Sequence, residues 1–105
     1  MNVLAIGCHP DDIEIACAGT MAKYAKAGHK VTVCHVANGN LGHEIIQSDE
    51  LRDIRKKEAE DAGAKIGIEV VSCDIGDLMV YEGQKTQRDL VVDVIRTYQP
   101  DVIFT

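Results

Sequence analysis

The sequence is poor in residues that interrupt regular structure, with two prolines and nine glycines among 105 residues. Together with 46% hydrophobic and 27% charged residues, this composition excludes a disordered tail and is typical of a folded globular domain. A chain of this length has room for one hydrophobic core and not for two. The sequence therefore predicts a single domain.

Basic residues are also scarce, because 11 lysines and arginines stand against 17 acidic residues, which gives a formal charge of -6. No cluster of positive charge exceeds the triplet Arg55, Lys56 and Lys57. A surface that binds nucleic acid or anionic membranes carries an excess of positive charge. The balance of charge therefore speaks against both kinds of partner.

Long apolar runs are absent. Stretches such as Met79 to Tyr81 and Val102 to Phe104 are far shorter than the ~20 residues that a membrane span requires. The N-terminus has no charged segment followed by an apolar one, so no secretory signal is visible. These absences predict a cytoplasmic protein without a membrane span.

The four cysteines show no C-x-x-C pair and no zinc-finger spacing. They are expected to be reduced and mostly buried as small apolar side chains. They are Cys8, Cys17, Cys34 and Cys73.

Short apolar runs alternate with longer stretches of helical periodicity along the whole chain. Gly28 marks the end of the first helix, the second ends at Lys65 with its apolar stripe broken near Gly63, and Pro100 follows the third. The apolar stripe of the second helix is read as Leu51, Ile54, Ala59 and Ala62, and that of the third as Leu90, Val91, Val94 and Ile95. The predicted strands are 3–7, 30–36, 68–73 and 101–105, and the predicted helices begin at residues 13, 48 and 84.

This alternation predicts an α/β fold, in the form of a Rossmann-like three-layer αβα arrangement with a mostly parallel sheet of four strands and three helices. Right-handed crossovers and the commonest doubly wound order give the strand order 3-2-1-4. Ligands of such sheets bind at the carboxyl ends of the strands, where the strand order reverses. The loop 8–12 and Thr105 are therefore expected to flank one crevice.

The run from Gly7 to Glu14 places one histidine and three carboxylates at that crevice, where the first strand is followed by a helix. His9 and Asp12 can supply two of the three protein ligands that a catalytic zinc ion takes, with Asp11 beside them as a general base. Two other interpretations stay open: these residues cap the helix, or Asp11 and Asp12 hold magnesium in a receiver-like regulatory module with Asp74 as phosphate acceptor.

The sequence resembles the LmbE-like or PIG-L deacetylases, zinc hydrolases that remove an acyl group from N-acetylglucosamine conjugates. Four stretches carry the resemblance, in the same order as in the family and over the whole chain. The first two, the metal motif and a small-residue turn, are His9-Pro10-Asp11-Asp12-Ile13-Glu14 and Ala18-Gly19-Thr20. The others are Asn38-Gly39-Asn40-Leu41-Gly42, which follows the second strand, and the helical Arg55-Lys56-Lys57-Glu58.

The resemblance implies that His9 and Asp12 bind Zn²⁺ or another divalent metal, and that Asp11 is the general base of amide hydrolysis. The substrate is then a small amino-sugar conjugate. Arg55 is implied as a hydrogen-bonding cation that faces the substrate, although a surface ion pair is the alternative for this residue. The loop around Asn38 and Gly39 is implied to line the sugar pocket, with Asp77 as a further substrate contact.

A third metal ligand is expected from a histidine-rich segment beyond Thr105, so the chain is expected to be the N-terminal part of a longer deacetylase domain. Among its own histidines, His43 is the only candidate replacement, since His35 reads as a satisfied strand residue and His29 as solvated at the opposite end of the sheet. Two open sheet edges predict a homo-oligomer or another pairing partner. A non-catalytic α/β domain stays open as an alternative.

Overall fold

The computed structural model describes all residues from 1 to 105 as seven regular elements that alternate between strand and helix. The strands are β1 (Asn2–Gly7), β2 (Lys30–Ala37), β3 (Glu69–Ile75) and β4 (Val102–Phe104). The helices are α1 (Asp12–Lys26), α2 (Ser48–Ile66) and α3 (Lys85–Tyr98). None of the three helices is both long and apolar enough to cross a membrane.

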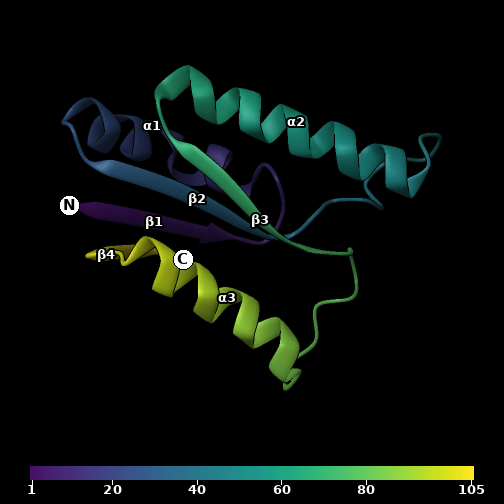
Figure 1. Cartoon of the computed structure of the whole chain (residues 1–105). Coiled ribbons are helices and arrows are strands. Elements are labelled where there is room, and N and C mark those ends of the chain that lie inside the picture. The colour runs from purple at the N-terminus through teal and green to yellow at the C-terminus, as the bar shows by residue number, and fades with distance from the viewer.

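The four strands form one sheet in which every pair is parallel, and their order is β3-β2-β1-β4. The predicted α/β class, strand order and element count are therefore confirmed. Parallel neighbours need crossover connections, and the helices supply them. Figure 1 shows α1 and α2 on one side of the sheet and α3 on the other, which makes three layers.

Alternation along the strands sends apolar side chains to both faces of the sheet, and each face has its own cluster. The cluster toward α1 contains six buried residues, among them Val3, Met21 and Val33. The cluster toward α3 contains Leu4, Cys34, Cys73 and Ile75. Burial of each large apolar side chain is worth about 1.5–3 kcal/mol, so these two clusters hold the sheet as a rigid platform for the loops at its ends.

Helix α1 begins with Asp12 and Glu14 in its first turn and ends with Lys23 and Lys26 in its last, the distribution of charge that the helix dipole favours. Gly28 follows with φ +87°, so its predicted role in ending the helix is confirmed. Cys17 has φ -150° and ψ 19°, and the helix is kinked there.

Helix α2 begins at Ser48 as predicted and continues to Ile66, one residue beyond the predicted end. Gly67 ends it with a left-handed φ of +74°. Gly63 is buried because α2 approaches β3 so closely that a Cβ at this position would meet the side chain of Val70. The predicted stripe is also partly wrong: Leu51 and Ala59 are buried, whereas Ile54 and Ala62 are exposed.

Three other details differ from the sequence prediction. Leu90 is exposed, while Val91, Val94 and Ile95 pack on the sheet as expected. Strand β3 extends to Ile75, and the register with β2 shifts between His35 and Ala37. At this shift β3 carries one residue more than β2, and Asp74 takes a φ of +53°. An extra residue in one strand bends it and re-aims the side chains that follow.

Candidate active site

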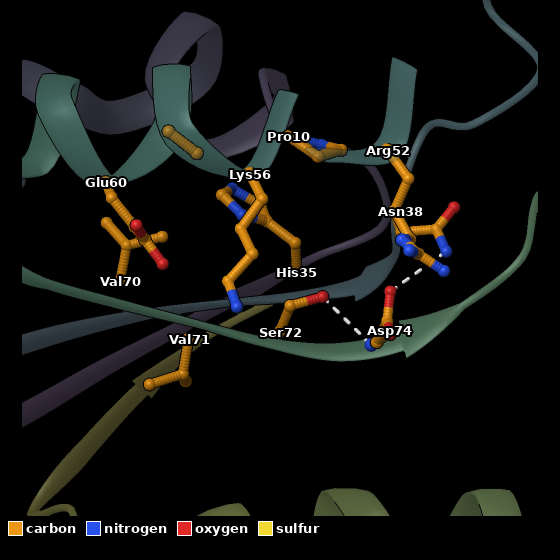
Figure 2. A pocket seen from close by; sticks show the side chains of 11 residues that line it. Pro10, His35, Asn38, Arg52, Lys56, Glu60, Val70, Val71, Ser72 and Asp74 are labelled. Atoms are coloured by element: carbon orange, nitrogen blue, oxygen red, sulfur yellow. Dashed lines mark hydrogen bonds between the residues drawn. The ribbon is translucent and has the colours of Figure 1, made fainter. Parts of the chain in front are cut away.

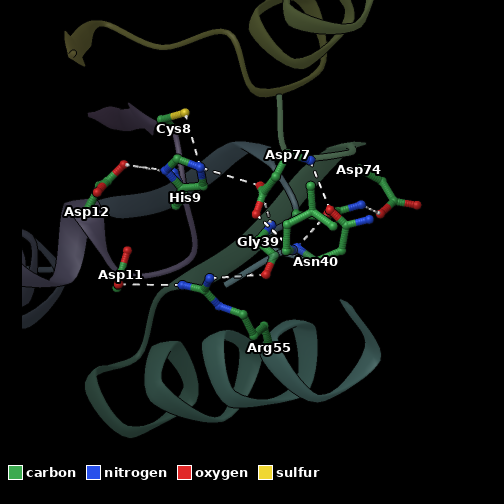
Figure 3. A network of polar contacts seen from close by, with 11 residues as sticks. Cys8, His9, Asp11, Asp12, Gly39, Asn40, Arg55, Asp74 and Asp77 are labelled. Carbon is green, nitrogen blue, oxygen red and sulfur yellow. Dashed lines mark hydrogen bonds and ion pairs between the residues drawn. The ribbon is translucent and has the colours of Figure 1, made fainter. Parts of the chain in front are cut away.

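The carboxyl ends of β1, β2 and β3 bring three loops together, and one network of polar contacts joins them (Figure 3). All seven predicted site residues lie in this network or touch it. The loop after β1 carries His9, Asp11 and Asp12, the loop after β2 carries Asn38 and Gly39, the loop after β3 carries Asp77, and α2 contributes Arg55.

The first loop is a tight turn closed by its own backbone, because the amides of Asp11 and Asp12 both donate to the carbonyl of His9. The carboxylate of Asp12 turns back and accepts the amide of His9 at 2.8 Å, and it lies 3.7 Å from Nδ1 of the same ring. Asp11 occupies the N-cap position of α1, but its side chain makes no capping hydrogen bond. The structure therefore shows no capping hydrogen bond from Asp11, and the carboxylate of Asp12 bonds within the turn.

Cys8 corrects one expectation, because it is exposed rather than buried. Its Sγ lies 3.9 Å from Nε2 of His9, and donor atoms of Cys8, His9 and Asp12 all lie within 4.8 Å of one another. Nitrogen, thiolate sulfur and carboxylate oxygen are the donors that zinc takes in proteins. Burial, followed by the nearby charges of Asp12 and Asp77, raises the pKa of the Cys8 thiol.

Arg55 reaches from α2 across the site rather than toward solvent, and only 19% of its side chain is exposed. One terminal nitrogen donates to the carbonyl of Gly39 at 3.2 Å, and the other lies 3.5 Å from the carboxylate of Asp11. Gly39 has φ +75°, and a Cβ there would collide with the guanidinium. The close approach of Arg55 therefore requires glycine at position 39. Arg55 does form an ion pair, but with Asp11 at the site rather than with a charge on the solvated face of α2.

Asp77 joins all three loops. Its Oδ1 accepts the amide of Gly39 at 3.0 Å, and its Oδ2 accepts the amide of Leu41 at 3.1 Å. In return the amide of Asp77 donates to Oδ1 of Asn40 at 2.9 Å, so the second and third loops hold each other reciprocally. Oδ1 of Asp77 also lies 3.4 Å from Nε2 of His9. This carboxylate therefore orders the loops at the same time as it faces the imidazole.

Asn38 is buried, and its side chain fixes the start of the second loop. The amide nitrogen donates to Asp74 at 3.0 Å, and the side-chain oxygen accepts the amide of Asn40 at 3.1 Å. A receiver-like module would need Asp74 to join Asp11 and Asp12 around a cation. Asp74 instead pairs with Asn38 and is not among the converging donor atoms, so this alternative is not supported.

Two hollows lie beside the network. One, of about 530 Å³, is lined by Cys8, Asp12 and Thr105 among others, which agrees with the expectation that the first loop and residue 105 flank one crevice. The other, of about 360 Å³, lies between α2 and β3. Figure 2 shows Arg52 and Lys56 reaching into it from α2, toward Ser72 and Asp74 on β3.

The remaining histidines serve other purposes. His35 is 1% exposed, and its Nε2 lies 3.4 Å from the carboxylate of Glu14, which fits the prediction of a satisfied strand histidine. His43 accepts two amides of its own loop through Nδ1, and it is not part of the converging group. His29 is only half-buried rather than fully solvated, because its Nδ1 lies 3.0 Å from the N-terminal amine and its ring packs near Tyr24.

Sequence reasoning missed Cys8 and Asn40 as members of the network. Cys8 directly precedes His9, so a thiol next to a candidate metal-binding histidine could have indicated that Cys8 belongs to the site. Asn40 belongs to the stretch Asn38-Gly39-Asn40, but a turn dipeptide alone does not tell which neighbour bonds across to another loop.

Comparison with known proteins identifies the family of the chain. Residues 4–105 match the family described as PIG-L: GlcNAc-PI de-N-acetylase. The 1D-myo-inositol 2-acetamido-2-deoxy-alpha-D-glucopyranoside deacetylase of Nocardioides sp. is 33% identical over 76 residues, which cover 64% of this chain and 25% of that protein. This chain thus spans about a quarter of the length of that relative.

Two solved structures share the fold closely. The N,N'-diacetylchitobiose deacetylase from Pyrococcus horikoshii superposes with a TM-score of 0.88 at 30% identity, over 98% of this chain and 39% of that one. The 4-carboxy-2-hydroxymuconate hydratase GalB from Pseudomonas putida superposes with a TM-score of 0.85 at 26% identity, over 98% of this chain and 46% of that one. With a family match over nearly its whole length, the chain belongs to the PIG-L family.

Proposed function

We propose that the carboxyl edge of the sheet is part of the catalytic centre of a metal-dependent deacetylase that acts on a small N-acetylglucosamine conjugate. The observation that carries the proposal is the convergence of His9 and Asp12 beside a carboxylate, Asp11, that Arg55 holds in place. Family membership supports the reaction class, and the relatives named as deacetylases of acetamido sugars support the substrate class.

The donor chemistry fits a divalent cation such as zinc. His9 and Asp12 would hold it as the protein ligands, and Cys8 lies close enough to contact the same position. The cation, when bound, supplies Lewis-acid activation of a water molecule and of the acyl carbonyl. A third protein ligand from a histidine stays a prediction.

We assign proton transfer to Asp11. Its carboxylate is free of the helix cap and 53% exposed, so a water molecule can reach it. Hydrolysis forms a bond between the water oxygen and the acyl carbon and breaks the bond between that carbon and nitrogen. Asp11 accepts the proton that the water loses and returns it to the departing amine. Arg55 fixes the direction of the carboxylate through its contact at 3.5 Å.

Arg55 and Asp77 are the proposed contacts to the sugar. A guanidinium has five N–H donors, and Arg55 uses only two of them on Asp11 and Gly39, so the rest can donate to substrate hydroxyls. Oδ2 of Asp77 accepts one amide and keeps a lone pair that can accept a hydroxyl. Asn38 and Gly39 shape the wall of the pocket rather than supply its reactive groups.

The direct test is acetate release from N-acetylglucosamine conjugates by the full-length protein with zinc or cobalt. General base catalysis is worth roughly 10²–10⁴-fold, so Asp11→Asn should lower turnover by about a hundredfold or more while the metal stays bound. Asp93→Asn is the matched control, because Asp93 is exposed on α3, far from the site in sequence and on the other side of the sheet. Unchanged turnover in Asp11→Asn would remove this residue from the mechanism.

A hydratase is the second candidate, because GalB shares the fold at 26% identity. Hydration adds water to a double bond and releases no acetate, so substrate panels of acetamido sugars and of unsaturated carboxylic acids separate the two activities. A protein that binds no metal and turns over neither panel would favour the non-catalytic alternative.

A homo-oligomer and a cytoplasmic location stay predictions.

A further inference from the structure

Two buried cysteines lie side by side on neighbouring strands, on the face of the sheet that α3 covers. Cys34 of β2 is 1% exposed and Cys73 of β3 is 9% exposed, and both are free thiols. Their sulfur atoms lie 3.8 Å apart. The proposed hydrolysis uses neither residue.

The position of the pair in the sheet is unusual. Cys34 stands opposite Val71 in the register, so Cys73 is two residues further along β3. The extra residue of β3 enters at this point, between the pairs His35 with Ser72 and Ala37 with Ile75. Residues two apart in a strand share a face, so Cys73 lies on the same face as Val71, and both cysteines belong to the same apolar cluster.

We propose that Cys34 and Cys73 form a reversible disulfide when the protein meets a peroxide. Cys73 attacks the peroxide, which oxidises its sulfur to a sulfenic acid and releases one water from hydrogen peroxide. Cys34 then attacks that sulfur, forms the S–S bond and expels the sulfenic oxygen as a second water. A small thiol reductant restores both thiols by exchange.

The direction of attack follows from the contact between the two groups. The two sulfur atoms are in hydrogen-bond contact, which lowers the pKa of Cys73 and raises that of Cys34, although burial raises the pKa of both. The thiolate is the form that reacts with peroxide, so Cys73 is the attacking sulfur and Cys34 the resolving one.

The cover over the pair is thin, and we infer that peroxide reaches the sulfurs when it opens. Helix α3 has no fully buried residue, and Val91, Val94 and Ile95 only half-bury themselves against the cluster that contains the two cysteines. Segments with few buried contacts open most easily. The other two cysteines make no such sulfur contact: Cys8 is exposed and lies beside His9, and Cys17 is half-buried.

A disulfide here would reach the proposed site, and this step rests on the proposed function. The bond must shorten the sulfur separation from 3.8 Å to about 2.05 Å. The backbone next to the bulge holds two site loops, because the amide of Ala37 donates to the carbonyl of Cys8 and that of Asn38 to the carbonyl of Ile75, both at 2.8 Å. Oxidation should therefore shift the loops that carry His9 and Asn38.

Peptide mapping of the intact protein tests the bond without any substitution. Trypsin yields one peptide with Cys34, residues 31–52, and another with Cys73, residues 66–85. Cys8 and Cys17 both lie in the peptide of residues 1–23. After treatment with hydrogen peroxide and alkylation of free thiols, we expect the first two peptides to be linked and lighter by two hydrogen atoms, and dithiothreitol to release them. Unlinked peptides with both thiols alkylated, or links that involve residues 1–23 instead, would overturn the proposal.

Variants test the link to the site. Peroxide should lower the activity of the wild type by at least several-fold, and dithiothreitol should restore it. Cys34→Ala should abolish this reversible loss, whereas the matched control Cys17→Ala should keep it. A reversible loss that persists in Cys34→Ala would refute the coupling. If the protein shows no deacetylase activity at all, the proposed function fails, and the mass of the linked peptides still decides whether the disulfide forms.

Discussion

The two ends of the sheet use polar groups differently. At the amino end each contact joins only two residues. The amide of Asn2 donates to Asp101 at 2.8 Å, and the hydroxyl of Tyr98 donates to Glu69 at 2.7 Å. At the carboxyl end the contacts converge, because Asp77 alone meets two amides and an imidazole.

The difference agrees with the site that we propose. The two contacts at the amino end are satisfied between the sheet and its adjoining segments. At the carboxyl end Asp12 stays 46% exposed and Asp11 53% exposed, although the residues around them are bonded to one another. Exposed carboxylates held among residues that are already ordered are typical of a reactive site. Such preorganised groups can act without moving during the reaction. Substitutions at the two ends should therefore have different consequences.

The largest effect is expected at Gly39. In Gly39→Ala the new Cβ would sit in a left-handed conformation and collide with the guanidinium of Arg55. Backbone strain of this kind costs roughly 1–3 kcal/mol, and the displaced Arg55 would no longer direct Asp11. We expect a lower midpoint of urea unfolding and a loss of activity of about a hundredfold. Gly19→Ala is the control, because a Cβ there meets no atom within 4 Å. Equal behaviour of the two variants would contradict the account.

Asp77→Asn should have the next largest effect. The amide side chain offers one acceptor oxygen instead of two, so either Gly39 or Leu41 loses its partner. A partly buried donor without a partner costs about 1–3 kcal/mol. We expect weaker protection of one of these two amides in hydrogen exchange and an activity at least about tenfold lower.

Asp101→Asn is the matched change at the amino end. Here the carboxylate accepts a single exposed amide, that of Asn2, and the asparagine oxygen can still accept it. We expect a change in unfolding free energy below about 1 kcal/mol and unchanged activity. Should Asp101→Asn lower activity as much as Asp77→Asn, the contrast between the two ends would be lost.

Tyr98→Phe should have the smallest effect. The hydrogen bond to Glu69, with a smaller contribution from burial, raises the pKa of Tyr98 to about 12. A raised pKa means that this contact stabilises the fold below the ordinary pKa of tyrosine near 10 and is lost as the pH rises toward 12. Among the three tyrosines, we expect one late step in a spectroscopic pH titration. The step should vanish in Tyr98→Phe, and a late step that remains would assign the shift to another tyrosine.

The architecture was predictable from the sequence because periodicity alone distinguishes strand from helix, and parallel connectivity then leaves few arrangements. The order β3-β2-β1-β4 and the position of the loop that contains His9 follow from these rules. The grouping of Arg55 with Asp11 came only from the family resemblance. Composition favoured a solvated helix face for that arginine.

The contacts between loops could not be read from the sequence. The clamp between Asn40 and Asp77 depends on the φ of +75° at Gly39, and the contact of Asn38 depends on the bulge that turns Asp74. A one-residue shift in register moves a side chain to the other face of a sheet, and no local sequence pattern predicts where such a shift occurs. The wrong assignment of Ile54 has a similar cause, because the packing of α2 against β3, at Gly63, decides which helix face is buried.

Metal binding tests the central claim most directly. The full-length wild type, His9→Ala, Asp12→Ala and His29→Ala would be compared by isothermal titration with zinc, and by elemental analysis after dialysis. His29 is the matched histidine at the amino end of the sheet, beside the N-terminal amine. We predict that wild type and His29→Ala bind one equivalent alike, and that His9→Ala and Asp12→Ala bind at least about tenfold more weakly. Equal affinity in all four proteins would contradict a metal centre at His9 and Asp12.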